Sequence, residues 1–567
     1  MSLREWIVGE IEKDKIMQCV NEWQVPPLTA AILYARGFRE KEEVLKFLNG
    51  HKNRENPFEI VDMDKIVSRV KNAIEFHEKI CVYGDYDSDG ITSTALIYSY
   101  LKSKGADVTY YIPSRHRDGY GLNKDAISML KGENINLIFT VDNGISAFEE
   151  VDFANSLGMD VVITDHHRVS GNIPNADAVV DPYRKECADL KHKNFAGVGV
   201  AFKVIEALEM GIKSFEAILE EYSDLVTLGT IGDSIELTGE TREIVKHGLK
   251  NISNSKRPGI KVLLRCAGLE GKILSAPSVA FGLVPRINAS GRMGNAELAL
   301  KLLLSENENE ALALCQELDN LNILRKNTES EILQSVEKIL NDEPHRKFEK
   351  ILIAEGESWN HGVLGIVASR ITQKYGKPSI LITTEGENAR GSCRSVESFS
   401  IHDVICSCSE HLQKFGGHPM AAGINLKTDN IENFRKSINK ISKNLDVPPP
   451  KLVLDLKLKP HKISEKLLYE LKMLEPFGSG NPEPVFGFFD MTLKKIKPIG
   501  QGKHLKLTFK HDNHELEALY FGKSICDFSH NEGEILDIAF TLHKNEYNGV
   551  ISVSIQIVDL RPSKSTL

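Results

Sequence analysis

Between residues 80 and 180, short apolar runs alternate with amphipathic stretches. The apolar runs predict strands at Ile80–Gly84, Val108–Ile112, Leu137–Val141, Val161–Thr164 and Ala178–Val180. Helical periodicity fills the gaps between them, at 92–104, 123–131 and 146–157. A strand followed by a helix, repeated at this spacing, predicts a parallel sheet covered by helices on both faces. Functional groups in such a sheet gather at the carboxyl ends of the strands.

The remaining stretches follow other patterns. The first 75 residues are expected to be helical, with breaks at Pro26-Pro27 and Asn56-Pro57. From Asn307 to Asp342 the chain has neither Gly nor Pro and repeats apolar residues every three or four positions, which predicts one long amphipathic helix. A second α/β pattern runs from 351 to 446. After Pro448-Pro449-Pro450, short alternating strands predict a small β-barrel of the oligonucleotide-binding (OB) kind.

A chain of 567 residues is too long for one hydrophobic core, so several domains are expected. The fold class we predict is α/β, with a parallel-sheet domain joined by a long helix to a second α/β domain, plus a C-terminal OB-like β-barrel. The expected boundaries are 1–75 for the helical segment, 76–305 for the parallel-sheet domain, 306–342 for the connecting helix, 343–447 for the second domain and 451–567 for the barrel.

Composition narrows the class of protein. Hydrophobic residues at 41% and charged residues at 26% are ordinary for a globular protein. The net charge of −9 argues against a uniformly basic coat for nucleic acid, although local basic grooves remain compatible with it. We find no signal peptide and no apolar run that could span a bilayer, so no membrane partner is expected. The nine cysteines lack a paired framework and are expected to be reduced thiols in a cytoplasmic protein.

Acidic and histidine side chains follow the predicted strands. Asp85, Asp87 and Asp89 come directly after the first strand, where three carboxylates would repel one another without a cation. Two later strands end in Asp142-Asn143-Gly144 and Asp165-His166-His167, and Asp233 follows the apolar segment 225–232. Any one cluster could be a solvated turn. Their recurrence at successive strand ends instead predicts a shared metal site.

Two divalent cations held close together can stabilise both the attacking and the leaving oxygen of a phosphoryl displacement. A ligand set for such a pair is available in Asp87, Asp89, Asp142, His166 and Asp233. Mixed oxygen and imidazole ligation favours Mn²⁺, with Mg²⁺ as a substitute.

Several strings carry a family resemblance: Tyr83 to Thr92, Asp165-His166-His167, Pro285 to Arg292, Phe415 to Gly423 and Glu475 to Pro484. Together they resemble the DHH phosphoesterase superfamily and, within it, the RecJ family of single-strand-specific exonucleases. The resemblance covers most of the chain in the expected order. It identifies 76–305 as a DHH phosphoesterase domain, 343–447 as a DHH-associated substrate-binding domain and 451–567 as an OB-fold-like nucleic-acid-binding domain.

The resemblance also implies roles for the metal-site residues. Asp87 would hold one metal, Asp89, His166 and Asp233 the other, and Asp142 would bridge them. Asp85 and Asp165 match motif acids that either bind a metal or orient a ligand, and His167 matches a position that faces the substrate phosphate. Two departures from the pattern remove no ligand: Ser88 stands where a small apolar residue is common, and Gly232 where Ala is common.

Basic and polar motifs are candidates for substrate contacts. Arg286, Asn288 and Arg292 lie among glycines without an acid, which suits phosphate binding, although a surface loop would look the same. By resemblance, Ser392 and Arg394 would hold a terminal 5′-phosphate, with Arg115 beside them, and His418 would contact the scissile or adjacent phosphate.

The predicted barrel has a local excess of positive charge. Residues 491–510 contain six lysines and no acid: Lys494, Lys495, Lys497, Lys503, Lys506 and Lys510. With Phe509 and Tyr520 nearby, this surface fits single strands bound through backbone charge and base stacking. A solvated lysine face explains any one of these side chains equally well.

The expected function is a metal-dependent exonuclease acting on single-stranded DNA. The resemblance implies a 5′-to-3′ direction, release of 5′-mononucleotides, a role in DNA repair and recombination, helicase and single-strand-binding protein as further partners, and a monomer. The alternatives are a phosphodiesterase for very short RNA or cyclic dinucleotides, a family II pyrophosphatase, and an inert single-strand-binding protein. The barrel argues against the first two, and the intact ligand set argues against the third.

Overall fold

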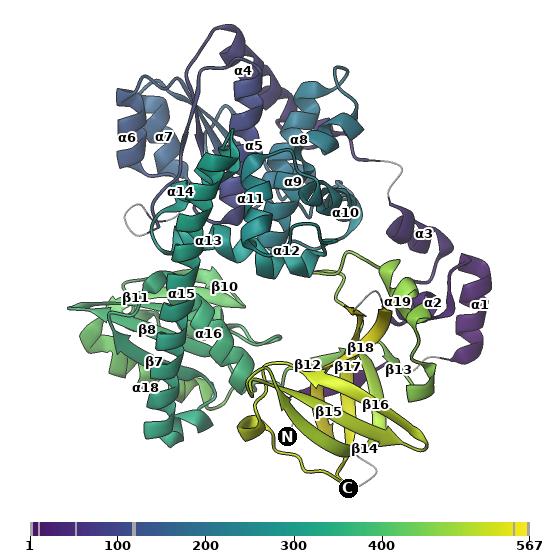
Figure 1. Ribbon diagram of the computed structural model, residues 1–567. Helices are drawn as coiled ribbons and strands as arrows, with labels where there is room; N and C mark the ends of the chain where they lie inside the picture. Colours follow the sequence, from purple (N-terminus) through teal and green to yellow (C-terminus); the bar gives the residue numbers. More distant parts are fainter. Residues whose placement is uncertain are drawn as a thin grey trace. The chain divides into compact units, whose positions relative to one another are not determined.

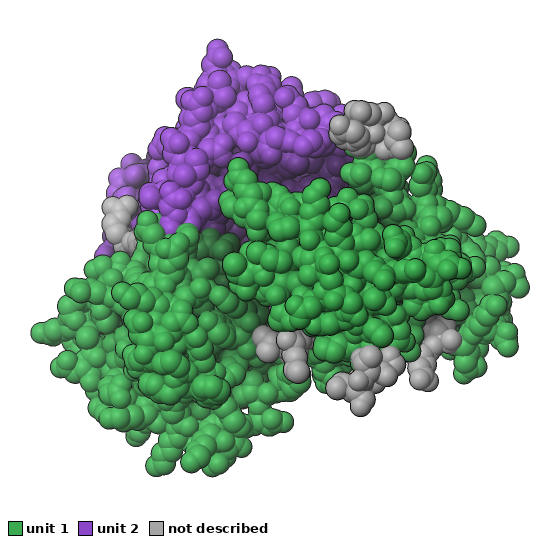
Figure 2. Space-filling view, turned by 60° about the horizontal axis from the view of Figure 1, so that its bottom comes forward, with its two compact units in different colours: residues 1–48, 328–475, 483–567 green, residues 49–327, 476–482 purple. Residues whose placement is uncertain are grey.

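A computed structural model describes residues 4–9, 12–50, 54–115, 119, 121–169, 171–547 and 550–563. The chain forms two compact units, coloured separately in Figure 2. Unit 1 comprises Met1–Leu48, Thr328–Glu475 and Glu483–Leu567, and unit 2 comprises Asn49–Asn327 and Pro476–Pro482. Each unit is therefore assembled from separate stretches of the sequence.

Unit 2, whose residues 49–327 run from purple to teal in Figure 1, contains a five-stranded sheet in which every neighbouring pair is parallel. Its strands are β2 (Ile80–Tyr83), β3 (Val108–Tyr111), β4 (Leu137–Val141), β5 (Asp160–Thr164) and β6 (Ala178–Val180). These are the five strands that the apolar runs predict. The spatial order β3-β2-β4-β5-β6 places β3 on one side of β2 and β4 on the other. The carboxyl ends of β2 and β4 therefore flank a topological switch point, where such sheets bind ligands.

Helices cover both faces of this sheet, as predicted. Ile80 and Val82 of β2 pack into one hydrophobic core, and Cys81 and Tyr83 pack into the other, because alternate strand residues face opposite sides. The first core is completed by α4 (Met63–Glu75), α5 (Ser88–Ser103) and α8 (Gly197–Glu209), and the second by α6 (Lys124–Gly132) and α7 (Phe148–Ser156).

The rest of unit 2 is helical: η1 (Pro57–Glu59), η2 (Lys185–Cys187), α9 (Phe215–Gly232), α10 (Gly239–Ser253), α11 (Pro258–Cys266), α12 (Ala276–Gly282), α13 (Val284–Arg292), α14 (Ala296–Leu304) and the first part of α15 (Glu308–Asp342). The distant segment 476–482 also packs here. Ser479 accepts a hydrogen bond from the Leu237 N–H at 2.8 Å, and Pro476 accepts one from the buried Arg242 guanidinium at 3.0 Å. Part of the Glu475 to Pro484 motif thus satisfies a buried arginine.

The long helix α15 matches the predicted 307–342 helix to within one residue. In unit 1 its last turns pair with α16 (His361–Tyr375) through Glu329–Arg370 and Glu337–Lys374. The second α/β domain has the sheet order β10-β11-β9-β8-β7, in which only β7 and β8 run parallel. Its elements are η3 (Pro344–Phe348), β7 (Leu352–Glu357), β8 (Ser379–Glu385), β9 (Asn388–Arg394), α17 (Ile401–Cys406), η4 (Ser409–His411), β10 (Lys414–His418), β11 (Ala421–Lys427), η5 (Thr428–Asn430) and α18 (Ile431–Ser442).

The predicted C-terminal barrel is present and closed. Its strands are β13 (Leu456–Lys457), β14 (Phe486–Ile499), β15 (His504–His511), β16 (His514–Tyr520), β17 (Ile535–Tyr547) and β18 (Val550–Pro562), preceded or joined by η6 (Pro460–Lys462), α19 (Glu465–Lys472) and η7 (Ile525–Asp527). Pairing of β14 with both β15 and β17 closes the ring. Phe509 is fully buried in the barrel interior, so its predicted role in base stacking is wrong. Its place in the alternating pattern puts it on the inner face of β15.

The first residues differ from the prediction. Residues 5–8 are not helical but form β1 (Glu5–Val8), which pairs in parallel with β12 (Lys451–Leu454). The indole N–H of Trp6 donates to Asp559 at 2.9 Å. Three helices follow in unit 1, α1 (Lys13–Trp23), α2 (Pro27–Ala35) and α3 (Lys41–Asn49). The helical segment is thus shared between the two units, and the predicted domain boundaries stay predictions.

Two predictions from the sequence concern membrane-spanning segments and the chemical state of the cysteines. Among the described residues, no helix combines the length and the apolar character that crossing a membrane requires. All nine cysteines lie within the described residues and are free thiols, as expected.

Candidate metal centre

The acids of the first motif surround the start of α5. Asp85 follows β2 after Gly84, and Asp87 caps α5 by accepting the N–H groups of Asp89 at 2.9 Å and Gly90 at 3.1 Å. A Cβ on Gly90 would lie 2.6 Å from the Asp85 Cα, so this sharp turn requires glycine. The strand-to-helix turn therefore concentrates three carboxylates at the carboxyl end of β2.

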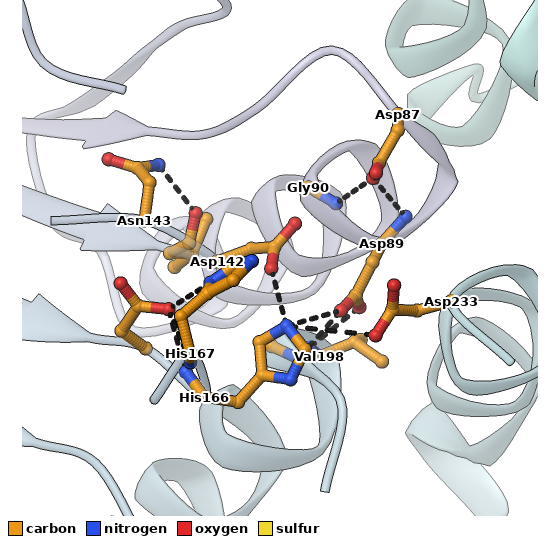
Figure 3. Close-up of polar contacts among 12 residues, drawn as sticks. Asp87, Asp89, Gly90, Asp142, Asn143, His166, His167, Val198 and Asp233 are labelled. Atoms are coloured by element: carbon orange, nitrogen blue, oxygen red, sulfur yellow. Dashed lines mark hydrogen bonds and ion pairs between the residues drawn. The ribbon is translucent and has the colours of Figure 1, made fainter. Parts of the chain in front are cut away.

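Asp89 is fixed by the start of a second helix. The Gly197 N–H donates to its Oδ2 at 2.6 Å, and the Val198 N–H donates to its Oδ1 at 2.9 Å (Figure 3). These are the first N–H groups of α8, which have no partner within the helix and carry its positive dipole end. Both carboxylate oxygens are thus held in one orientation.

Asp142 follows β4 in a left-handed backbone conformation, with φ +63°. Such a conformation is uncommon for a residue with a side chain and marks functional sites. A Cβ on Gly197 would lie 2.5 Å from the Asp142 Cβ, so the close approach of α8 to β4 depends on glycine there. The strained turn aims the Asp142 carboxylate at His166, 3.0 Å from its Nε2.

Asp165 organises the third motif through its buried carboxylate. Its Oδ1 accepts the His166 N–H at 2.7 Å and the His167 N–H at 3.1 Å, and it lies 2.7 Å from the His167 Nδ1. Its Oδ2 accepts the Ile145 N–H at 2.9 Å. Asp165 therefore orients the His167 imidazole directly and holds the backbone of His166.

Asp233 reaches the site from a helix. The apolar segment before it belongs to α9, and Asp233 is the C-terminal cap of that helix. Its Oδ2 lies 3.7 Å from the His166 Nε2, and its side chain is 32% exposed. The segment crosses α5 closely, because Gly229 and Gly232 leave room for Thr92 and Ser88 of α5.

Six side chains form two clusters suited to metal binding. In each cluster, one potential ligand atom per residue lies within 4.8 Å of the others: Asp85, Asp87 and Asp142 in the first, and Asp89, His166 and Asp233 in the second. Asp142 links the clusters through its 3.0 Å approach to His166. In Figure 3 the side chains of Asp89, Asp142 and Asp233 lie around the His166 ring, and they come from the start of α5, the end of β4 and the end of α9.

The clustered carboxylates repel one another strongly. Burial and the neighbouring Asp233 raise the pKa of Asp89 well above its usual range. Burial and Asp89 do the same to the pKa of Asp142, and burial and Asp87 raise the pKa of Asp233 to about 7. Such repulsion is relieved when cations lie among the carboxylates.

The two histidines differ in charge. Burial and the adjacent His167 lower the pKa of His166 to about 4, so its imidazole is neutral and able to bind a metal. Burial opposes protonation of His167, but the hydrogen bond to Asp165 outweighs it and raises the pKa of His167 to about 9. His167 is therefore a cation beside the carboxylates, with 43% of its side chain exposed.

The donor set fits divalent metals of the Mn²⁺ and Mg²⁺ class, since it consists of carboxylate oxygens and one neutral imidazole. In addition, the buried Oδ1 of Asp85 has no hydrogen-bond partner among the described residues. A buried carboxylate oxygen without a donor is costly unless a cation satisfies it.

Two predicted substrate contacts in unit 2 have other partners. The Arg286 guanidinium pairs with Asp319 at 2.6 Å and donates to the carbonyls of Gly282 and Cys266. Asn288 accepts the Ser88 N–H at 2.8 Å, which fixes the first turn of α5. These contacts tie both side chains to the internal structure of unit 2, and their role in binding substrate stays a prediction. Arg292 ends α13, which is a helix and not a loop.

Arg115 lies at the end of the described segment after β3. Its guanidinium stands 5.3 Å from the centre of the Tyr86 ring, in the acidic motif. It also lowers the pKa of Asp85, although burial and Asp87 outweigh this effect. Arg115 therefore contributes positive charge near the candidate metal-binding carboxylates.

The predicted phosphate contacts in unit 1 cluster on one sheet. Ser392 and Arg394 lie on β9, and the Arg394 Nη1 donates to the Ser392 Oγ at 3.2 Å. A Cβ on Gly365 of α16 would lie 2.5 Å from the Arg394 Nη2, so glycine lets the guanidinium rest against this helix. His418 ends β10 and is exposed. Register pairs Arg394 with Ala421 of β11, the strand adjacent to β10.

Two features of the site escaped the sequence analysis. The N–H pair of Gly197 and Val198 that holds Asp89 is signalled only by a glycine-rich helix start. Asp181 follows β6, and burial raises its pKa to about 8. Its position after a predicted strand follows the same rule as the other acids and could have identified it.

Comparison with known proteins supports the architecture. Residues 79–230 match the DHH family N-terminal domain, 348–444 the DHHA1 domain and 454–559 the RecJ OB domain. The single-stranded-DNA-specific exonuclease RecJ of Bacillus subtilis is 34% identical over 99% of this chain and 71% of its own length. The Escherichia coli protein of the same name is 32% identical over 95% of this chain and 96% of its own length.

Solved structures agree with these relatives. The crystal structure of RecJ in complex with Mn²⁺ from Thermus thermophilus superposes with a TM-score of 0.84 at 30% identity, covering 99% of this chain and 80% of that one. The complex with Mg²⁺ from the same organism gives 0.78 at 29% identity, covering 99% and 78%. With its three matching domains and its full-length relatives, the chain belongs to the RecJ family of single-stranded-DNA-specific exonucleases, metal-dependent enzymes of the DHH superfamily.

Proposed function

We propose that this chain hydrolyses single-stranded DNA from the 5′ end with two divalent cations, Mn²⁺ or Mg²⁺, and releases 5′-mononucleotides. The observation that carries the proposal is the pair of ligand clusters connected by Asp142 and His166. Asp87 and Asp85 would hold one cation, Asp89, His166 and Asp233 the other, and Asp142 would bridge them.

When bound, the two cations would lower the pKa of water and neutralise charge on the phosphoryl oxygens. The chain's own residues fix the ligands before substrate arrives. Asp89 is held by the α8 N–H groups, and Asp142 by its strained turn. Ligands held in this way need little reorganisation during the reaction.

His167 supplies the charge that faces the phosphate. The hydrogen bond from Nδ1 to Asp165 keeps the imidazole protonated, which leaves Nε2–H as a donor on a partly exposed side chain. A charge-assisted hydrogen bond from this group to a phosphate oxygen would strengthen as negative charge develops in the transition state.

The remaining candidates would hold the strand. Ser392 and Arg394 would bind the terminal 5′-phosphate, since a guanidinium beside a hydroxyl matches phosphate geometry. His418, Arg115 and Arg292 would contact other phosphates. The lysines of β14 and β15 would attract the backbone, although Lys506 is already paired with Glu517 at 2.7 Å.

Further predictions rest on family resemblance: action in DNA repair and recombination, partnership with a helicase and a single-strand-binding protein, a monomeric state and a cytoplasmic location. The domain boundaries are also predictions: 1–75, 76–305, 306–342, 343–447 and 451–567.

The test is Asp142→Ala, with Asp152→Ala as the control, because Asp152 is an exposed aspartate on α7 of the same unit. Single strands labelled at the 5′ or the 3′ end, duplexes and dinucleotides are incubated with Mn²⁺ or with a chelator. We expect early release of the 5′ label from single strands, none with chelator, and a loss of more than ~10²-fold in Asp142→Ala, since losing outer metal partners alone costs ~10–100-fold.

Three outcomes would contradict the proposal. Near-normal turnover in Asp142→Ala would refute the two-metal assignment. Early release of the 3′ label would reverse the direction. Cleavage of dinucleotides alone would favour the short-oligonucleotide phosphodiesterase.

A further inference from the structure

A third group of potential metal ligands lies outside the acidic centre. Cys266 ends α11, and Cys315 and Asp319 stand on α15. One ligand atom from each residue lies within 4.8 Å of the other two. Unlike the catalytic cluster, this group offers two sulfurs and a single carboxylate.

Helix geometry brings the three together. Cys315 and Asp319 are four residues apart on α15, so their side chains share one face of the helix. Cys315 is fully buried, whereas Cys266 and Asp319 are partly exposed. Cys315 thus anchors the group in the core of unit 2, and the side of Cys266 and Asp319 is partly exposed to solvent. A water molecule on that side could complete a four-ligand shell.

Arg286 balances the charge of this group. Its guanidinium pairs with Asp319 at 2.6 Å and donates to the backbone carbonyl of Cys266 at 3.3 Å. Two thiolates and a carboxylate carry three negative charges, which a divalent cation and one arginine would neutralise. This pairing accounts for the inward orientation of an arginine whose sequence motif suggests phosphate binding.

We propose that Cys266, Cys315 and Asp319 form a zinc site that fastens α11 and, through Arg286, α13 to the long helix α15. Binding replaces the two S–H bonds with sulfur–zinc bonds, and the two protons pass to water. Soft thiolates select zinc over Mn²⁺ and Mg²⁺. The oxygen and imidazole donors of the catalytic centre instead suit Mn²⁺ and Mg²⁺. Burial and the Cys266 thiol raise the pKa of Cys315, so without zinc this side chain stays a thiol.

Cobalt replaces zinc in such sites and reports on its ligands. The reduced, chelator-treated full-length protein is titrated with Co²⁺ while the near-ultraviolet thiolate-to-cobalt band and the visible bands of tetrahedral cobalt are recorded. In the unmodified chain we expect the thiolate-to-cobalt band and the tetrahedral cobalt bands. The thiolate-to-cobalt band should reach its maximum at one equivalent of Co²⁺, and it should disappear when Zn²⁺ displaces the cobalt. Cys315→Ser and Cys266→Ser should abolish it.

The control is Cys187→Ser, the same substitution at a buried cysteine of the same unit. It should retain the thiolate band. Circular dichroism shows that each variant is folded, and Cys315→Ala serves if the serine is not tolerated. Three outcomes would overturn the proposal. The thiolate band could be absent from the reduced unmodified protein, or it could survive in folded Cys315 and Cys266 variants. A Cys266–Cys315 disulfide could also form in place of metal binding under the same conditions. None of these results depends on the exonuclease activity.

Discussion

The contact between Ser88 and Gly232 offers a sharp test of how the centre is positioned. The structure places these two residues against each other where α5 meets α9. A Cβ on Gly232 would lie 2.0 Å from the Ser88 Oγ and 2.9 Å from the Ser88 Cβ. Ser88 stands between the proposed ligands Asp87 and Asp89, and Gly232 precedes the proposed ligand Asp233. Gly232→Ala should therefore push the two ligand-bearing segments apart.

The expected magnitude combines two opposing effects. Inserting a methyl group into a packed contact costs about 1–3 kcal/mol. Replacing Gly by Ala within a helix gains up to about 1 kcal/mol, although Gly232 is the last residue of α9 and gains less. Stability should therefore fall by about 1–2 kcal/mol. Activity should fall more, since a displacement of ~1 Å at a catalytic group can cost ~10²-fold.

Ser88→Ala/Gly232→Ala tests whether this contact is the cause. Removing the Ser88 Oγ relaxes the closest approach from 2.0 to 2.9 Å, so the double variant should regain a large part of both losses. The assays are urea unfolding and the initial rate of mononucleotide release at saturating Mn²⁺, with Ser88→Ala alone as the control. Wild-type activity in Gly232→Ala, or the absence of any recovery in the double variant, would refute the reasoning.

Three further predictions follow from the site. Asn288→Ala removes the acceptor of the Ser88 N–H, so stability should fall by about 1 kcal/mol, measured in urea, with a several-fold slower cleavage at saturating Mn²⁺. Arg394→Ala should reduce the preference for a 5′-phosphate more than the maximal rate, measured by comparing phosphorylated and hydroxyl 5′ ends; an unchanged preference would place the end-binding pocket elsewhere. Mn²⁺ at 100 times its Kd should stabilise the protein by about 2.7 kcal/mol, so the Tm should fall when a chelator removes the metal. In Asp142→Ala most of this change in Tm should be lost.

Much of the centre could be predicted from sequence because parallel sheets bring strand ends together. Asp87, Asp142 and His166 each follow a predicted strand, so the rule that predicts the sheet also predicts their meeting. Asp233 is predicted from the apolar segment 225–232 before it, but that segment belongs to a helix, so the approach of Asp233 depends on how α9 crosses α5.

The errors share one physical cause, which is that local patterns do not reveal tertiary partners. Arg286 and Asn288 have the chemistry of phosphate contacts, but the sequence does not show that Arg286 also pairs with Asp319 and that Asn288 also accepts the Ser88 N–H. Phe509 lies in a correctly predicted strand, but the alternating pattern alone does not say which barrel face an aromatic residue occupies. The four residues of β1 are too few for periodicity to outweigh the helical signals that follow.

The pairing of β1 with β12 sets an order on events during protein synthesis. Residues 5–8 leave the ribosome long before their partner strand at 451–454, which emerges only after all but the last stretch of unit 2. The residues from 49 to 327 have most of their contacts available much earlier. The nascent chain would thus fold its catalytic half while an unpaired β1 awaits its partner, and a truncated chain that ends before β12 would expose that edge to aggregation.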